Sequence, residues 1–331
     1  MKKRLKSLLK SIFPEKIFLV RSLLIGYWYD LNRYLKHSNS YKNIDTIQKY
    51  EALLTYYYHV VEKGLTMPEP RVGFGFENMN RLMKLCLEYV NEGFDVERDT
   101  FVHCLSVMEE YLEFHCDADY TVDSELERGV QQLLENRNIR RIRQIEVSSE
   151  DFFRHRNSDF SIFSRSRHTV RNYIDKIIPD DVFKECVELA QKSPSACNRQ
   201  PNHVYIIRDA DTQEKVLSLQ NGNRGFGHLA NAIVVFTGNV SSFRFADERN
   251  ELYLNSGMFA MSFIYALHNK GIGSCALNWS VAPRVDRKLR RIIEIPDNET
   301  ITLLLSCGYL PNRIKVAASP RRETNEAVSF I

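Results

Sequence analysis

Apolar residues in the first half of the chain recur at the spacing of an α-helix. Between residues 44 and 63 the apolar positions Ile47, Tyr50, Leu53, Leu54 and Tyr57 fall on one side of a helix. The same periodicity predicts three more helices, at about 77–92, 97–115 and 123–137. Residues 138–160 are strongly charged and have few apolar positions, which predicts a connector. The pattern therefore predicts an all-helical N-terminal region over residues 1–150.

The pattern changes after about residue 160. Residues 180–192 have helical periodicity, and Asn250–Asn269 is apolar nearly all round, which predicts a buried helix. Apolar, partly β-branched runs predict four strands, at 203–208, 232–237, 273–279 and 300–307. Strands that alternate with helices favour a sheet flanked by helices. We therefore predict an α+β domain over residues 151–331.

Composition narrows the class of protein. The chain has 331 residues and a net charge of +3, which argues against a nucleic-acid-binding protein. Its seven cysteines are scattered and never spaced Cys-x-x-Cys, which argues against a disulfide framework, a zinc site or an iron–sulfur cluster. We expect no metal site, and a reducing, cytoplasmic location.

The first 40 residues are basic, with nine Lys and Arg against two acidic residues and hence a net charge of +7. The apolar run Ile17–Tyr29 is interrupted by Arg21 and is too short to span a bilayer. No small-residue cleavage site follows, so no signal peptide is expected. One interpretation is a basic amphipathic helix on an anionic membrane surface. The blander interpretation, which we favour here, is a solvated basic face with a buried apolar stripe.

Two arginines four residues apart open the second domain. In the segment Arg167–Arg171 they would share one face of a helix, which Ser166 or Thr169 could cap. Guanidinium groups and the N–H groups at a helix start both bind phosphate oxygens. The segment therefore suggests a phosphate site, and the alternative is ordinary surface charge.

A second motif is the loop Ser193–Pro201, between a predicted helix and a predicted strand. Its small side chains let a planar ligand approach the backbone, and the carboxamides of Asn198 and Gln200 suit the polar edge of a heterocycle. Read alone, it could equally be an ordinary capped loop. Two weaker elements follow: a helix end that runs into a strand at Gly271–Trp279, and a basic pair, Arg321 and Arg322.

In this order, the four elements resemble the FMN-dependent nitroreductase family over about residues 160–331. The loop Pro194–Pro201 matches that family's Pro-Ser-x-x-Asn-x-Gln-Pro motif and is the most specific signal. The resemblance implies an α+β fold and a homodimer with two FMN molecules at its interface. One departure is Ala276–Trp279, where many members have Pro-x-Glu-Gly; it puts the contacts at the flavin N5 edge in doubt. The glycines of Asn221–Gly227 do not have the spacing of a dinucleotide-binding fingerprint.

The resemblance also assigns roles to residues. The arginines would hold the FMN phosphate, the small residues of the loop would lie along the ring system, and the end of the strand at 273–279 would bring N–H groups near it. The implied cofactor-binding residues are Arg167, His168, Thr169, Arg171, Pro194, Ser195, Ala196, Asn198, Gln200, Leu277, Asn278, Arg321 and Arg322.

Three functions compete. The resemblance favours an oxidoreductase in which NAD(P)H reduces FMN and a small electron-poor acceptor then takes the electrons at the same open face, so no catalytic side chain is nominated. The second is a same-fold flavoenzyme that acts on a specific biosynthetic intermediate, which the extra helical region supports. The third is a non-catalytic, membrane-associated flavoprotein.

The segment His59–Gly75 looks unlike a simple helix connection. It combines His59, Glu62, Lys63 and Arg71 with prolines and glycines, and Gly64 could cap the preceding helix. One hypothesis makes it a lid over the substrate side of FMN, with His59, Arg71 and Arg224 as substrate residues; the alternative is a structural loop.

At the other end of the chain, the resemblance suggests that Ala327–Ile331 adds as a strand to a partner's sheet.

Overall fold

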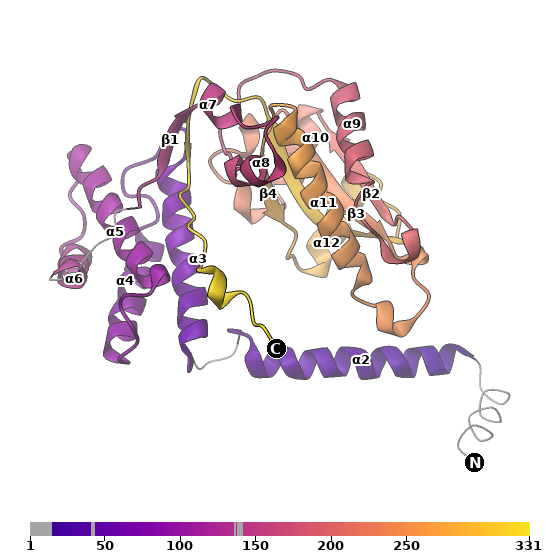
Figure 1. Ribbon diagram of the computed structural model, residues 1–331, viewed down its shortest axis with the longest axis horizontal. Coiled ribbons are helices and arrows are strands. Elements are labelled where there is room, and N and C mark those ends of the chain that lie inside the picture. Colours follow the sequence, from indigo (N-terminus) through magenta and orange to yellow (C-terminus); the bar gives the residue numbers. More distant parts are fainter. Residues whose placement is uncertain (1–14, 41–43, 136, 138–141) are drawn as a thin grey trace, which may run out of the picture.

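The computed structural model of the chain describes residues 15–40, 44–135, 137 and 142–331 (Figure 1). Of the basic N-terminal segment, residues 1–14 lie outside the described residues. The regular structure of the described residues before 145 is helical, and strands with further helices between them appear from there on.

Four helices of the N-terminal region pack around one apolar core. They are α3 (Ile47–Leu65), α4 (Phe76–Asn91), α5 (Asp99–Asp117) and α6 (Ser124–Leu134), as the apolar periodicity predicts. Buried side chains from all four meet in this core, among them Leu54, Tyr89, Tyr111 and Leu133. The core holds α3 firmly, and α3 in turn faces the rest of the molecule (Figure 1).

The end of α3 differs from the prediction. Gly64 is not its cap: the helix continues to Leu65, and Thr66 is the C-cap, with its N–H bonded to Glu62 O and Gly64 O. A Cβ at Gly64 would overlap the ring of Phe74. The glycine is therefore there for the close approach of an aromatic ring, a long-range reason that helix-end patterns do not reveal.

The second part of the chain contains a four-stranded antiparallel sheet of order β2-β3-β5-β4. Its strands are β2 (Asn202–Ile207), β3 (Ala232–Asn239), β4 (Gly273–Asn278) and β5 (Glu299–Gly308), close to the predicted bounds. Neighbouring residues of β3 point to opposite faces, so Ile233 and Val235 join one core and Val234 and Phe236 the other.

Helices cover both faces of this sheet. The face with Val234 packs against α9 (Asp180–Ala190) and α11 (Glu251–Asn269). The other face packs against α10 (Ala210–Leu217) and α12 (Pro283–Ile292). The fold is therefore α+β, with a helical N-terminal region, as predicted.

The predicted connector at 138–160 is wrong in part, because it contains regular structure. It includes β1 (Ile145–Ser148) and α7 (Ser149–Phe153), and α8 (Phe160–Ser166) follows. β1 pairs antiparallel with β6 (Arg313–Val316), and Ile145 lies opposite Val316. Four residues are too few for a clear local pattern, and the partner strand is nearly 170 residues away in the sequence.

After β6 the chain returns to the helical region. Residues 317–326, which we name the C-terminal strap, run beside α3 (Figure 1). Ala318 N donates to Gln144 Oε1 at 3.0 Å, and Arg98 pairs with Glu326 at 3.3 Å. The segment Ala327–Ile331, suggested as a strand, is not a strand in this chain and is exposed.

Helix α2 (Glu15–His37) touches the rest of the molecule on one side only (Figure 1). It contacts the turn η5 (Ala246–Glu248), and Asp30 pairs with Arg249 at 2.8 Å. Its apolar residues are mostly exposed, Leu24 and Trp28 among them. The interpretation of a buried apolar stripe is thus wrong within a single chain. No helix in the described residues is long and apolar enough to cross a bilayer.

Candidate functional site

The segment Arg167–Arg171 is extended, not helical as predicted. α8 ends at Ser166, and Arg167 already has extended backbone angles. The backbone of this segment pairs with edge strand β4, since Val170 N donates to Ser274 O at 3.0 Å. Alternate residues of an extended segment share a side, so Arg167 and Arg171 still lie on one side, for a different reason than expected.

A cavity of about 320 Å³ brings two of the predicted motifs together. Arg167, His168, Thr169 and Arg171 line it from the extended segment, and Arg321 lines it from the strap. Its third wall is one face of α3, which the sequence did not predict as part of the cofactor site. That wall consists of Thr55, Tyr58 and His59.

Arg171 is the most telling residue of this cavity. It is only 7% exposed, and its Nε is buried without a hydrogen-bond partner. The guanidinium lies 5.9 Å from the ring centre of Phe226 and forms a hydrogen bond with the thiol of Cys275, and no carboxylate of the described residues forms an ion pair with it. A buried, unpaired guanidinium is costly. This arrangement therefore fits an anionic ligand that binds here.

The pKa shifts of the groups around the cavity also fit an anionic ligand. Burial lowers the pKa of Arg167, and burial together with neighbouring arginines lowers the pKa of His168 and Lys63. The pKa of His268, behind the segment, falls to about 4 through burial and the charges of Arg167 and His168. Burial and the mutual repulsion of these groups thus disfavour positive charge here, and a bound anion would relieve part of that repulsion.

Glu62 is the buried carboxylate beside this cavity, and its oxygens already have partners. They contact His103 Nε2 at 2.8 Å, His59 Nδ1 at 3.3 Å and Ser319 N at 3.1 Å. Burial alone would raise the pKa of Glu62, but hydrogen bonds from His103 and His59 outweigh it and hold the pKa at about 2. Glu62 is thus ionised and bound to the strap, not to the arginines.

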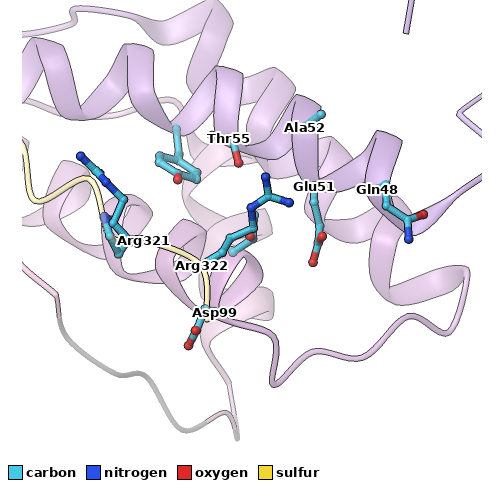
Figure 2. A pocket seen from close by; sticks show the side chains of 10 residues that line it. Gln48, Glu51, Ala52, Thr55, Asp99, Arg321 and Arg322 are labelled. Atoms are coloured by element: carbon cyan, nitrogen blue, oxygen red, sulfur yellow. The ribbon is translucent and has the colours of Figure 1, made fainter. Parts of the chain in front are cut away.

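A second cavity, of about 430 Å³, continues along α3 on the other side of the strap. Figure 2 shows Arg322 beneath α3 between Thr55 and Glu51, whereas the side chain of Arg321 is directed away from Arg322. Arg321 lines both cavities and Arg322 only this one. Of the predicted basic pair, Arg321 is therefore the residue that reaches the arginine cavity.

The loop Ser193–Pro201 is fixed to α11. Ser193 Oγ donates to Met258 O at 3.2 Å, and Ala196 N donates to Asn255 Oδ1 at 2.8 Å. Asn198 and Gln200 have positive φ angles of 55° and 47°, which residues other than glycine rarely adopt, and both residues are exposed. A strained, firmly held loop with exposed carboxamides fits a ligand-binding role.

This loop and the arginines lie apart within one chain. The loop contacts α11 at Asn255, whereas Ser166, next to the arginine segment, contacts His268 near the other end of that helix. Thirteen residues separate these positions, about 20 Å along a helix. Pro194, Ser195, Ala196, Asn198 and Gln200 do not line the arginine cavity.

The predicted strand end belongs to β4, the edge strand with which the arginine segment pairs. Leu277 is buried and Asn278 is exposed at the end of β4. Gln220 Nε2 donates to Asn278 O at 3.1 Å, which fixes the strand end to the start of the loop Asn221–Gly227. Neither residue lines the arginine cavity.

The three predicted substrate residues have different positions. His59 lines the arginine cavity, but Arg71 is exposed and does not line it. The loop around Arg71 is held on α5, where Gly73 N donates to His115 Nε2 at 2.9 Å. Arg224 is exposed on the loop Asn221–Gly227. The lid over the substrate stays a prediction.

Lys63 was not predicted as a site residue. Its Nζ donates to Gly222 O at 3.2 Å, so α3 reaches the second domain directly. Thr55 and Tyr58 were missed as well. The available signal was the row of polar residues at Thr55, His59, Glu62 and Lys63 along one helix.

Residues 164–309 match the model of the nitroreductase family. Because of this similarity, we call residues 164–309 the nitroreductase domain. Its relatives include a protein of Archaeoglobus fulgidus with the provisional name NADH dehydrogenase/NAD(P)H nitroreductase, 28% identical over 147 residues, which are 44% of this chain and 81% of that protein. The 4-nitrobenzoate reductase of Nocardioides sp. is 21% identical over 52% of this chain and 90% of its own length. The domain is that of an oxidoreductase.

Solved structures resemble the nitroreductase domain over about the same half of the chain. The nitroreductase family protein of Streptococcus pneumoniae is 21% identical, with a TM-score of 0.45, and the match covers 52% of this chain and 100% of that one. A provisionally named nitroreductase of Exiguobacterium sibiricum, in complex with FMN, is 16% identical, with a TM-score of 0.46, over 53% of this chain and 98% of that one.

Proposed function

We propose that the protein is an FMN-dependent oxidoreductase that uses NAD(P)H to reduce a small electron-poor acceptor. The observation that carries this proposal is the buried Arg171, whose Nε has no hydrogen-bond partner, in a cavity with Arg167 and Arg321 inside the nitroreductase domain. Guanidinium groups at one site are well suited to a phosphate. Bound FMN would supply the hydride transfer, first from the donor and then to the acceptor.

The chain's own residues would bind and orient this cofactor. Arg167, Arg171 and Arg321 would hold the phosphate, and Thr169 would donate a hydrogen bond to it from its hydroxyl group. Asn198 and Gln200 would contact the polar edge of the ring system or fix the loop around it. No side chain is assigned as a nucleophile or an acid, because the cofactor carries the chemistry.

The cofactor itself tests this proposal. The protein should purify yellow, and heat or acid should release FMN, identified by chromatography against FMN and riboflavin standards. Riboflavin bound as tightly as FMN would contradict a phosphate role for the arginines. A protein that neither contains nor takes up flavin would contradict the proposal as a whole.

We expect a homodimer, because the loop and the arginines lie at opposite ends of α11 in one chain. A second copy can bring its loop to the first copy's arginines, which would place two FMN molecules at the interface. The exposed apolar residues Tyr253 and Leu254 at the start of α11 are available for such a contact. Light scattering at micromolar concentration should give twice the chain mass; a monomer that still binds FMN tightly would contradict this expectation.

A more specific reaction is the second candidate function. The arginine cavity has a wall from α3, outside the nitroreductase domain, and a second cavity of about 430 Å³ follows it. A region that covers the site favours a particular acceptor, such as a biosynthetic intermediate, over many small ones. Comparable turnover of many unrelated nitro compounds and quinones would argue against this candidate. The third candidate, a non-catalytic flavoprotein, predicts flavin without turnover.

Helix α2 supports the membrane contact suggested by the basic N-terminus. Ile17, Leu24 and Leu31 repeat every seven residues, and Trp28 and Leu35 lie beside them, so these five share one side. All five are exposed, on the side away from the Asp30–Arg249 contact. An apolar face with Trp, flanked by basic residues, is typical of interfacial helices.

We therefore predict that the protein floats with anionic liposomes and less with neutral ones. Replacing Trp28 with Glu should reduce the floated fraction several-fold, because it places a charge in the apolar face. Ser22→Glu adds the same charge on another side of the helix and should have a smaller effect. Equal effects of the two variants would show that only net charge matters, and binding indifferent to lipid charge and salt would contradict the electrostatic part.

The remaining expectations complete this proposal. We propose two units, a helical one over residues 1–150 and an FMN-binding one over 151–331, and a reducing, cytoplasmic location, with the first 40 residues in contact with the membrane surface. Separate apolar cores before and after about residue 145 support the division.

A further inference from the structure

The C-terminal strap has an unusual backbone conformation just before the residue that reaches the arginine cavity. Ser319 has a φ of 40°, in the left-handed region that residues other than glycine avoid. Pro320 and Arg321 follow at once, and both line the cavity. A strained residue persists where its surroundings hold it, so the contacts of Ser319 determine where Arg321 lies.

Those contacts come from one buried carboxylate of the helical region. Ser319 N donates to Glu62 Oε1 at 3.1 Å, and Ser319 Oγ donates to Glu62 Oε2 at 3.3 Å. Glu62 is fully buried, and His103 of α5 donates to it at 2.8 Å from the other side. The carboxylate is thus fixed by the helical core before it meets the strap.

Arg321 is connected to the same residue. Its Nη1 donates to the carbonyl oxygen of Ser319, which turns the side chain back along the strap. Among the described residues, Glu62 forms no ion pair with this arginine, and its oxygens contact His103, His59 and Ser319 instead. The connection therefore runs from Glu62 through Ser319 to Arg321, and it leaves the charge of Arg321 available to a ligand.

We propose that Glu62 is a positioning residue of the cofactor site: it holds the strap so that Arg321 meets the FMN phosphate. This inference rests on the proposed function. It assigns the helical N-terminal region a role in cofactor binding, through a contact between residues 257 positions apart in the sequence. The region is thereby a part of the site and not an independent appendage.

A double-mutant cycle on FMN affinity tests the proposal, with flavin fluorescence as the readout. Arg321→Ala should weaken FMN binding about tenfold or more, the usual effect of one charge-assisted hydrogen bond. Glu62→Gln, which keeps the shape of the side chain, should weaken it about 5- to 10-fold. In the Arg321→Ala background, Glu62→Gln should have almost no further effect, because the residue it positions is already absent.

The outcomes distinguish a failure of the positioning role from a failure of the proposed function. Full additivity of the two effects would overturn the positioning role, whereas wild-type protein that does not bind FMN would overturn the proposed function as well. Leu133→Ala, in the helical core but on α6, is the matched control: it should destabilise the helical region without changing FMN affinity. If Leu133→Ala weakens FMN binding as much as Glu62→Gln does, a general loss of stability explains both and the proposal fails.

A milder variant covers the case in which Glu62→Gln does not fold. Ser319→Ala removes only the hydroxyl contact to Glu62 Oε2 and keeps the N–H contact. It should weaken FMN binding two- to threefold at most, again only while Arg321 is present. The same loss in the Arg321→Ala background would count against the proposal.

Discussion

Replacing Arg171 with alanine should weaken FMN binding roughly 10- to 150-fold, since a charge-assisted hydrogen bond contributes roughly 1.5–3 kcal/mol. The side chain is buried and its Nε has no hydrogen-bond partner among the described residues, so a ligand phosphate would supply the charged partner that the guanidinium lacks. The variant should therefore lose cofactor affinity and little stability, because it also removes a buried unpaired charge. Fluorescence titration with FMN and thermal unfolding without cofactor measure the two quantities.

A matched control separates this site effect from a general loss of positive charge. Arg313 on β6 is highly exposed and does not line the arginine cavity. Arg313→Ala should bind FMN with wild-type affinity. Arg171→Ala with unchanged FMN affinity, or with a large loss of stability and no loss of affinity, would show that this arginine has a structural role only.

The second large effect concerns the stability of the helical region. Glu62→Ala should lower the free energy of unfolding by about 3–5 kcal/mol, the usual cost of removing one partner from a buried ionic pair. It leaves His103 and the N–H of Ser319 without their acceptor. Urea unfolding at neutral pH, followed by circular dichroism, measures the loss.

The same carboxylate predicts a pH dependence. The pKa of Glu62 is about 2 in the folded chain and 4.5 ordinarily, since hydrogen bonds from His103 and His59 outweigh its burial. A depressed pKa adds stability that is complete above pH 4.5 and is lost as the pH falls from 4.5 towards 2. The loss in this window should be about 3 kcal/mol.

Glu62→Gln provides the comparison, because its amide does not titrate. The stability difference between wild type and this variant should shrink as the pH falls through the same window. A difference that stays constant from neutral pH to pH 3 would contradict the assignment of an ionised, hydrogen-bonded Glu62.

Local pattern was enough to predict most of the regular structure. The apolar spacing of α3 to α6 and the apolar runs of β2 to β5 predicted their places, because each element buries one face or both. The motifs were recognised in another way, from the types of their residues and the order of the motifs along the chain. Arg167 and Arg171 were recognised although their segment is extended, since residues four apart share a side in an extended segment as well as in a helix.

The rest depends on contacts between distant parts of the sequence. β1 exists because β6 pairs with it, and Gly64 lies within a helix because the ring of Phe74 needs the space. The role of α3 at the site follows from the strap, whose Ser319 meets Glu62 across the molecule. None of these pairings has a periodicity or a motif that reveals it in the sequence alone.

The central claim is that the arginine cavity belongs to a working flavoenzyme. Anaerobic stopped-flow mixing of the FMN-loaded protein with NADH, and separately with NADPH, tests it most directly. The account predicts that at least one donor bleaches the visible flavin absorbance in a reaction that saturates with donor concentration, and that an electron-poor acceptor, added afterwards, restores the absorbance. Flavin that stays oxidised with both donors, while dithionite reduces it readily, would contradict the account.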